Sequence, residues 1–214
     1  MVLNEAAKRL GVSLKQTEDT LTRDMLAGTA SVINCTGGVN GDSPTELTRS
    51  DVDNVVKTLK GNNGKPFLSG IAGEDKFGSA PVRWAYFALG HTDLIGDLEN
   101  VSGFVSQIQY PNPMNALSDA EWGSISNLRF MLSSIGSVTA TSSGNNMADV
   151  YNIFCVAREA YAVVEQDGYS AQFIYRPPIY DGPLALNSSA GYKMAQVPRI
   201  LNDLWVQNLR CTLA

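Results

Sequence analysis

The chain has 214 residues, of which 44% are hydrophobic and 17% are charged, and its net charge is −5 at pH 7. This length can bury a substantial core in one large domain or in two small interwoven ones. The acidic pI of about 4.9 argues against specific DNA or RNA binding, because a nucleic-acid-binding domain usually has a basic face. No apolar run approaches the ~18 residues needed to span a bilayer, so no membrane partner is expected.

The charged share is lower than the roughly 25% that is typical of globular chains. A thin layer of charge suits a protein whose surface is covered by copies of itself. It also suits a monomer coated with Ser, Thr and Asn, and composition alone favours this second interpretation.

The three cysteines, Cys35, Cys155 and Cys211, are far apart in the sequence and form no Cys-x-x-Cys pair. Each has apolar neighbours, where a free cysteine behaves as a small buried hydrophobic residue. The pattern indicates a reducing compartment and no disulfide framework.

The N-terminal quarter of the chain has helical periodicity. Apolar residues over 3–10 predict a short helix that Gly11 ends. Ser13 and Gln16 form a capping-box pattern, which predicts a second, longer helix from 13 to about 34. These residues place a weakly apolar stripe on one side of that helix, as expected for a helix that lies across a sheet.

A third helix is predicted after a loop of turn-forming residues over 36–47. Thr48 is its N-cap and Asp51 its third residue, in a capping-box pattern. Apolar residues then recur at helical spacing from Val52 to Leu59, and Gly61 is expected to end the helix in the left-handed conformation.

Strand patterns follow in the rest of the chain. The predicted strands are 82–89, 128–131, 150–157, 161–165, 172–175, 192–199 and 204–213. Thr92 is expected to cap a short helix through Leu98, and 100–125 is expected to be irregular. Asp167-Gly168 is a strong turn dipeptide, so 161–165 and 172–175 are predicted to pair as a hairpin. Because helices precede strands, the sequence predicts an α+β fold and not a regular βαβ alternation.

His91 is the single histidine of the chain. A Ser-His-Asp or Cys-His mechanism needs a base near neutral pH and would have to use this residue. Its place after a strand favours hydrogen bonding within a turn. The sequence has no Gly-x-Ser-x-Gly elbow, no phosphate-binding glycine loop and no paired zinc ligands. We therefore predict no catalytic, cofactor-binding or metal site, and no cofactor.

Eight different short motifs follow one another along most of the chain. They are Gln16-Thr17-x-x-x-Thr20-x-x-Arg23-Asp24, Ala27-Gly28-Thr29, Leu47-Thr48-x-x-Asp51-Val52, Leu59-Lys60-x-Asn62-Asn63-x-Lys65-Pro66, Tyr86-Phe87-Ala88-Leu89-Gly90-His91-Thr92-Asp93, Tyr161-Ala162-Val163-Val164, Arg176-Pro177-Pro178 and Leu201-Asn202-Asp203-Leu204-Trp205. In this order and spacing they resemble the major capsid proteins of tailed double-stranded-DNA phages of the N-four type, which have the Hong Kong 97-like fold.

The resemblance implies a peripheral domain over 1–65 and about 166–200, in which a spine helix at about 13–34 lies over a sheet. It implies a mixed α/β axial domain over about 66–165 and 201–214. It also implies a structural protein that is not an enzyme. The chain is expected to begin where the family's N-terminal arm and extended loop would end, so weak self-association of this chain is expected.

The partners that the resemblance implies are first of all copies of the same protein, assembled as pentamers and hexamers into an icosahedral head. Scaffold, portal and decoration proteins are further expected partners. The shell would enclose double-stranded DNA without sequence-specific binding. The expected location is the virion, after synthesis in the bacterial host cytoplasm.

Two other functions stay open at the level of sequence. One is a small soluble hydrolase that uses His91 with Asp93. The other is a carbohydrate- or peptide-binding module, for which the Asn/Ser/Thr-rich loops and the Tyr and Trp residues are the motivation.

Overall fold

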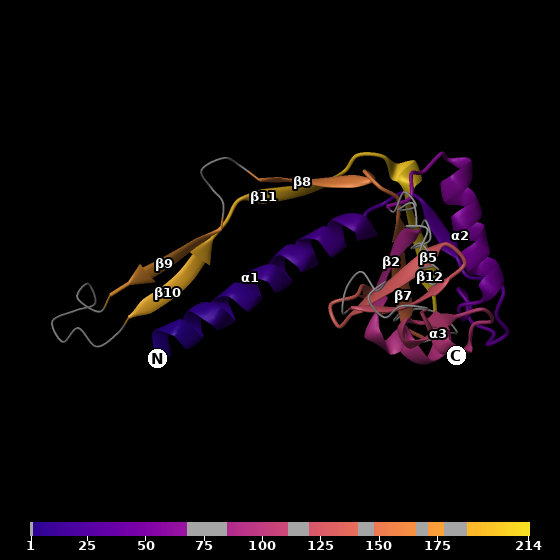
Figure 1. Ribbon diagram of the computed structural model, residues 1–214, viewed down its shortest axis with the longest axis horizontal. Helices are drawn as coiled ribbons and strands as arrows, with labels where there is room; N and C mark the ends of the chain where they lie inside the picture. Colours follow the sequence, from indigo (N-terminus) through magenta and orange to yellow (C-terminus); the bar gives the residue numbers. More distant parts are fainter. Residues whose placement is uncertain (1, 68–84, 111–119, 141–147, 166–170, 178–187) are drawn as a thin grey trace, which may run out of the picture. The chain divides into compact units, whose positions relative to one another are not determined.

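The computed structural model describes residues 2–67, 85–110, 120–140, 148–165, 171–177 and 188–214 (Figure 1). The chain divides into two compact units. The ribbon unit comprises Met1–Thr22 and Tyr161–Arg199, and the sheet unit comprises Arg23–Ala160 and Ile200–Ala214. The chain therefore passes between the units three times, once within its first helix.

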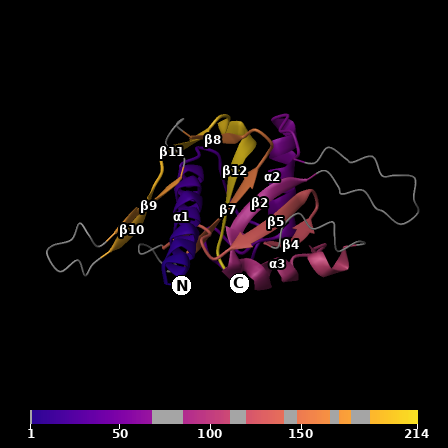
Figure 2. The same cartoon turned by 60° about the vertical axis from the view of Figure 1, so that its left-hand side comes forward.

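The sheet unit is built on an eight-stranded mixed sheet with the order β1-β12-β7-β2-β5-β4-β3, and β6 pairs with β7 (Figure 2). The strands are β1 (Val32–Asn34), β2 (Tyr86–His91), β3 (Val105–Ser106), β4 (Glu121–Ile125), β5 (Leu128–Ser133), β6 (Val138–Thr139), β7 (Val150–Val156) and β12 (Val206–Cys211). β1 runs parallel to β12 and β2 parallel to β5, whereas the other pairs are antiparallel.

One face of this sheet forms the core with helix α2 (Arg49–Gly61). Val52, Val55 and Leu59 of α2 are fully buried, as their helical spacing predicts. The capping box of Thr48 and Asp51 is present. The left-handed residue after the helix is Asn63, with φ of 56°; Gly61 is the last helical residue, so the stop predicted at Gly61 is wrong by two positions.

Helix α1 (Val2–Ala27) is continuous for 26 residues. The predicted break at Gly11 and cap at Ser13 are therefore wrong. A glycine inside a helix costs only about 1 kcal/mol, and the long helix tolerates it. The predicted end at about 34 is also wrong, because Val32–Asn34 pairs with β12 as β1, a long-range contact that local periodicity does not encode.

The ribbon unit combines α1 up to Thr22 with two two-stranded sheets. β8 (Tyr161–Glu165) pairs with β11 (Gln196–Ile200), and β9 (Gln172–Arg176) pairs antiparallel with β10 (Ser189–Lys193). The strands predicted at 161–165 and 172–175 are thus confirmed, but their pairing as a hairpin is wrong. The dipeptide Asp167-Gly168 lies outside the described residues.

The other predicted strands have mixed outcomes. Those at 128–131 and 150–157 are confirmed as β5 and β7, and 82–89 overlaps β2, although 82–84 lies outside the described residues. The run 192–199 belongs to β10 and β11 with a break between them, and 204–213 contains β12 after the short helix η5 (Asp203–Trp205).

The remaining local predictions concern 92–125. The expected helix after His91 is present as η1 (Thr92–Leu94) and α3 (Ile95–Asn100). The region predicted to be irregular contains β3, η2 (Gln107–Gln109) and β4. The α+β class is confirmed: the chain combines a long helix with a large mixed sheet. The limits of the peripheral and axial domains stay a prediction. None of the helices in the described part of the chain has the length and apolar character that a membrane crossing requires.

Candidate functional site

His91 ends β2 and caps the short helix that follows. The Asp93 N–H donates to His91 Nδ1 at 3.1 Å, so His91 and not Thr92 is the N-cap of η1. The Tyr151 hydroxyl donates to the Asp93 carboxylate at 3.1 Å. Among the described residues, the side chain of His91 bonds to Asp93 alone, without a Ser or Cys nucleophile. The arrangement is that of a helix cap, as the position of His91 after a strand predicts.

The buried thiols are arranged for packing and not for reactivity. Cys35, Cys155 and Cys211 are free and buried, as predicted. A hydrogen bond with Cys211, followed by burial, raises the pKa of Cys35, and burial raises the pKa of Cys155. A thiol held in its protonated form is a poor nucleophile and a poor metal ligand. No cluster of three or more metal-ligand side chains occurs in the described part of the chain.

The most unusual surface is on the strands of the ribbon unit. In β9 every residue is exposed, including Phe173, Ile174 and Tyr175, at 48%, 51% and 42%. The register pairs Phe173 with Tyr192 and Ile174 with Gly191. Because side chains alternate along a strand, three aromatic rings share one face and Ile174 lies on the other.

The aromatic face of the β9–β10 strand pair contacts α1 through Tyr192. The hydroxyls of Thr17 and Tyr192 are 3.3 Å apart. The aromatic rings nevertheless stay more than a third exposed. The helix therefore covers this face only in part.

The exposed apolar surface extends over both strand pairs of the ribbon unit. The exposed large hydrophobic residues of the unit are Val12, Leu21, Val163, Val164, Phe173, Ile174, Tyr175, Tyr192 and Val197. An isolated two-stranded ribbon is only marginally stable in water, and among the described strands β8 to β11 each has a single partner, which leaves one edge open. Open edges and clustered apolar side chains are features of a surface that another chain covers.

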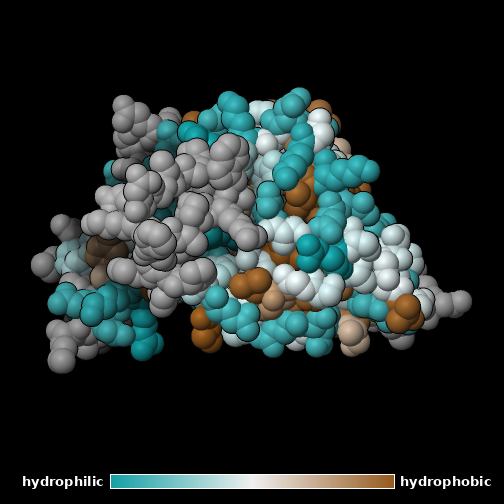
Figure 3. Space-filling view, turned by 45° about the vertical axis from the view of Figure 1, so that its right-hand side comes forward, coloured by the Kyte–Doolittle hydropathy of each residue, from teal (hydrophilic) through white to brown (hydrophobic). Residues whose placement is uncertain are grey.

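The sheet unit has a different surface. Its exposed large hydrophobic residues are Val32, Val39, Val105, Ile108, Trp122, Val138, Leu201, Leu204 and Leu213. On the face drawn in Figure 3, brown hydrophobic patches are separated by teal and white residues. Single apolar side chains of this kind are normal on a folded protein.

One end of the large sheet is acidic on balance, although the guanidinium groups of Arg23 and Arg49 donate to the backbone oxygens of Ile135 and Ser102 there. The strand directions bring together the segments that follow β1, β2, β5 and β12 and the one that precedes β7. The acidic residues of these segments are Asp42, Glu46, Asp93, Asp97, Glu99 and Asp149, and the described parts of the segments 35–48, 92–106, 134–150 and 212–214 contain no Lys or Arg. Burial, helped by the charge of Glu46, raises the pKa of Asp97. This end would repel the phosphates of DNA.

The loop between β1 and α2 is fixed by Glu46. Its carboxylate accepts the N–H groups of Val39 and Asn40 at 2.5 and 2.9 Å. Gly38 makes this possible, because a Cβ there would lie 2.2 Å from the Glu46 side chain. The two N–H donors lower the pKa of Glu46 below its ordinary value of 4.5.

We expect the loop to loosen in acid. Since the folded-state pKa of Glu46 is lowered, the two hydrogen bonds are fully present above pH 4.5 and are lost as the pH falls through the lower folded-state pKa. In NMR spectra, the amide shifts of Val39 and Asn40 should titrate only below pH 4.5 in the wild type. Glu46→Gln keeps an acceptor but should abolish this titration. A titration of the wild-type amides centred above that pH would contradict the assignment.

Comparison with known proteins gives no match to a protein family and no match to a curated protein at the level of sequence. Solved structures do match. The head structure of Helicobacter pylori bacteriophage KHP40 contains a chain with a TM-score of 0.64 and 12% identity, and the alignment covers 99% of this chain and 68% of that one.

The fold of this chain is that of a phage capsid protein. The acid-stable capsid of Helicobacter pylori bacteriophage KHP30 gives a TM-score of 0.61 at 10% identity, covering 99% of this chain and 69% of that chain. A chain of Mycobacterium phage Che8 gives 0.56 at 14% identity, covering 96% and 62%. The resemblance to phage capsid proteins is therefore confirmed at the level of the fold, and this chain spans about two thirds of the length of these capsid-fold chains.

Proposed function

We propose that this chain is the shell-forming region of a major capsid protein from a tailed double-stranded-DNA phage. The observation that carries the proposal is the phage capsid fold, which aligns over 99% of the chain with chains from a phage head and a phage capsid. The activity is assembly: copies associate as pentamers and hexamers and close an icosahedral head around the DNA. The protein has no catalytic turnover and no cofactor in this proposal.

The surface of the chain supports this proposal. The ribbon unit presents apolar side chains, and each of its described strands pairs with only one other described strand, so an identical partner can cover this surface. The acidic end of the sheet unit fits a wall that encloses DNA without gripping it. His91 has the bonds of a helix cap, and the raised pKa values of Cys35 and Cys155 keep these two thiols protonated.

In the same proposal, the chain has two domains and resides in the virion. Residues 1–65 and about 166–200 would form the peripheral domain, and about 66–165 with 201–214 the axial domain. Scaffold, portal and decoration proteins would contact the assembled shell. The protein would be made in the cytoplasm of the bacterial host and reside in the virion.

The direct test is assembly. The natural gene product that contains this chain should form capsomers or closed shells in negative-stain electron micrographs, and should sediment as large discrete species in analytical ultracentrifugation. Lysate from cells without the gene is the control for contaminating particles. A gene product that stays monomeric at every protein and salt concentration, alone or expressed with its neighbouring genes, would refute the proposed function.

A further inference from the structure

Among the described residues of the sheet unit, Arg210 has no ion-pair partner. It lies near the end of β12, between Asn34 on β1 and Asn152 on β7 in the strand register. Its Nε atom is buried and has no hydrogen-bond partner. No carboxylate of a described residue forms an ion pair with Arg210, although Arg23, Arg49 and Arg129 all have one.

The neighbours of Arg210 are polar but uncharged. Asn208, on the same face of β12, donates to the Asn152 side chain at 3.2 Å, and its own Oδ1 is buried and unpaired. Asn152 in turn donates to the hydroxyls of Ser137 and Thr139 at 3.2 and 2.9 Å. The hydrogen bonds of this network join uncharged side chains, so none of its members neutralises the charge of the Arg210 guanidinium.

This polar face is open at one side. β1 is the edge strand of the sheet, and its residues Val32 and Asn34, which are in register with Asn208 and Arg210, are exposed. The opposite face of β12, with Leu209 and Cys211, is buried in the core. Arg210 therefore lies one strand in from an exposed edge and is itself only partly buried.

A partly buried guanidinium without a partner destabilises the isolated chain, because its desolvation is not offset by an ion pair. The Nε–H of Arg210 lacks an acceptor among the described residues, so an acceptor from another chain can bind it. We propose that Arg210, beside Asn34, binds a carboxylate of a second copy of this chain. This inference rests on the proposed function, and it adds a specific contact to it.

Charge favours a carboxylate of another copy over the alternatives. The chain carries 21 acidic residues against 16 basic ones, so any second copy presents carboxylates in excess. A planar guanidinium accepts a carboxylate in a bidentate pair. DNA is the less suitable anion, because a duplex would bring many phosphates to an end of the sheet that has six carboxylates, whereas a second copy places one carboxylate against Arg210.

The first test measures anion binding on the unassembled chain, so that its outcome does not depend on the proposed function. Thermal unfolding is compared in sodium acetate and in sodium chloride at equal ionic strength. Wild type should unfold at a higher temperature in acetate, and Arg210→Met should lose this difference. In chloride Arg210→Met should unfold at a higher temperature than wild type, because an unpaired charge is removed. No acetate effect on wild type, or an equal effect on the variant, would overturn the site.

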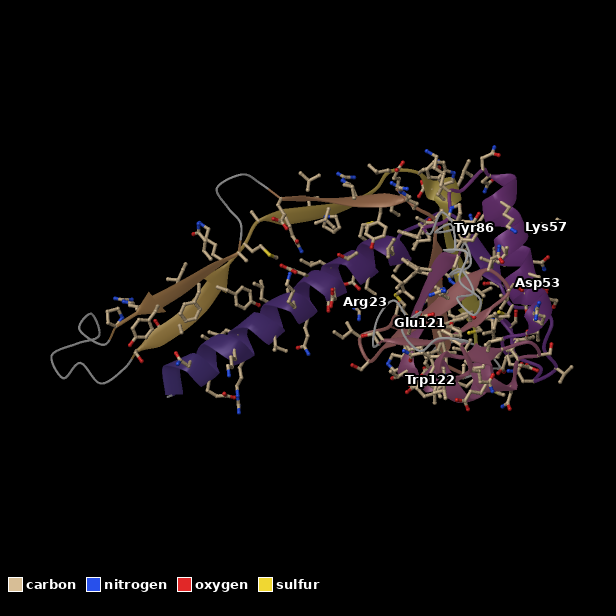
Figure 4. All side chains as sticks on the ribbon, in the orientation of Figure 1. Arg23, Asp53, Lys57, Tyr86, Glu121 and Trp122 are labelled. Atoms are coloured by element: carbon tan, nitrogen blue, oxygen red, sulfur yellow. The ribbon has the colours of Figure 1, made fainter. Side chains whose placement is uncertain are left out.

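The second test identifies the occupant. In the natural gene product, Arg210→Met should raise the protein concentration needed for assembly about tenfold or more, as expected when a partly buried ion pair is lost. Lys57→Met removes an exposed charge on α2 (Figure 4) and should assemble like wild type. Normal assembly of Arg210→Met, or binding of a short DNA duplex that requires Arg210, would overturn the second copy as the occupant. Failure of wild type to assemble would instead count against the proposed function. The comparison of acetate with chloride would still test whether Arg210 binds a carboxylate.

Discussion

Replacing Glu121 by alanine is expected to lower the free energy of unfolding by about 3–5 kcal/mol, the usual cost of breaking a buried ion pair. The Glu121 side chain, labelled in Figure 4, is fully buried. It lies 3.4 Å from the guanidinium of Arg129, whose side chain is 7% exposed. The Tyr110 hydroxyl donates to Glu121 at 2.8 Å. Removing the carboxylate would leave a buried cation, and urea denaturation followed by circular dichroism would measure the loss.

Tyr110 completes this cluster. The Arg129 guanidinium lies 5.6 Å from the centre of its ring, and burial raises the pKa of Tyr110 to about 12. The phenol therefore stays protonated at neutral pH and can donate to Glu121. The cluster joins β4 and β5 to the segment after β3, which explains why the effect should be large.

Two variants serve as controls for Glu121→Ala. Glu5→Ala removes an exposed ion pair with Arg9 and should change stability by less than about 1 kcal/mol. The double variant Glu121→Met with Arg129→Met replaces both charges by apolar groups and should recover most of the loss. A single variant as stable as wild type would mean that the pair is not desolvated in the folded protein.

The elements that the sequence predicts best are those fixed by local chemistry. The capping box at Thr48 and the apolar spacing from Val52 to Leu59 lie within one helix, so their interpretation needs no knowledge of the rest of the chain. The same local reasoning fails at Gly11. A glycine alone predicts a helix end, but the flanking residues on both sides continue the helix.

The sequence does not predict β4, because the features that make this segment a strand depend on tertiary contacts. Glu121 is buried there because Arg129 and Tyr110 lie beside it, so its charge wrongly suggests a loop. Gly123 is needed because a Cβ at this position would lie 2.4 Å from the ring of Phe104. The register also shifts between Glu121 and Gly123. Each of these features depends on a residue from another segment.

The two candidate contact surfaces, on β9 and at Arg210, are not predicted by the sequence. The run Phe173-Ile174-Tyr175 has the composition of a core strand, and sequence alone does not distinguish a strand buried within its own chain from one covered by a neighbour. Arg210 gives no sequence signal either, because its lack of a counter-charge depends on the neighbouring strands. The resemblance to capsid proteins, carried by motifs along most of the chain, predicted the fold, whereas the turn dipeptide Asp167-Gly168 led to a wrong pairing of 161–165 with 172–175.

In the natural gene product, Ile174→Lys is expected to weaken assembly while leaving the fold intact. Burying an isoleucine side chain at a contact is worth about 1.5–3 kcal/mol, and each 1.4 kcal/mol changes an equilibrium constant tenfold. If copies cover this face of the ribbon, the concentration needed for assembly should rise about 10- to 100-fold, as measured by light scattering. Ile174 is 51% exposed in the single chain, so the free energy of unfolding should change by less than about 0.5 kcal/mol.

The matched control is Asn54→Lys, which adds the same charge on the exposed side of α2 in the sheet unit. It should assemble at the wild-type concentration, because only a charge on the covered face has to be desolvated at the contact. Equal inhibition by both lysines would attribute the effect to net charge. Normal assembly of Ile174→Lys would show that this face of the ribbon stays in water within the shell, and the contact would then have to be made by the aromatic face that Phe173, Tyr175 and Tyr192 share.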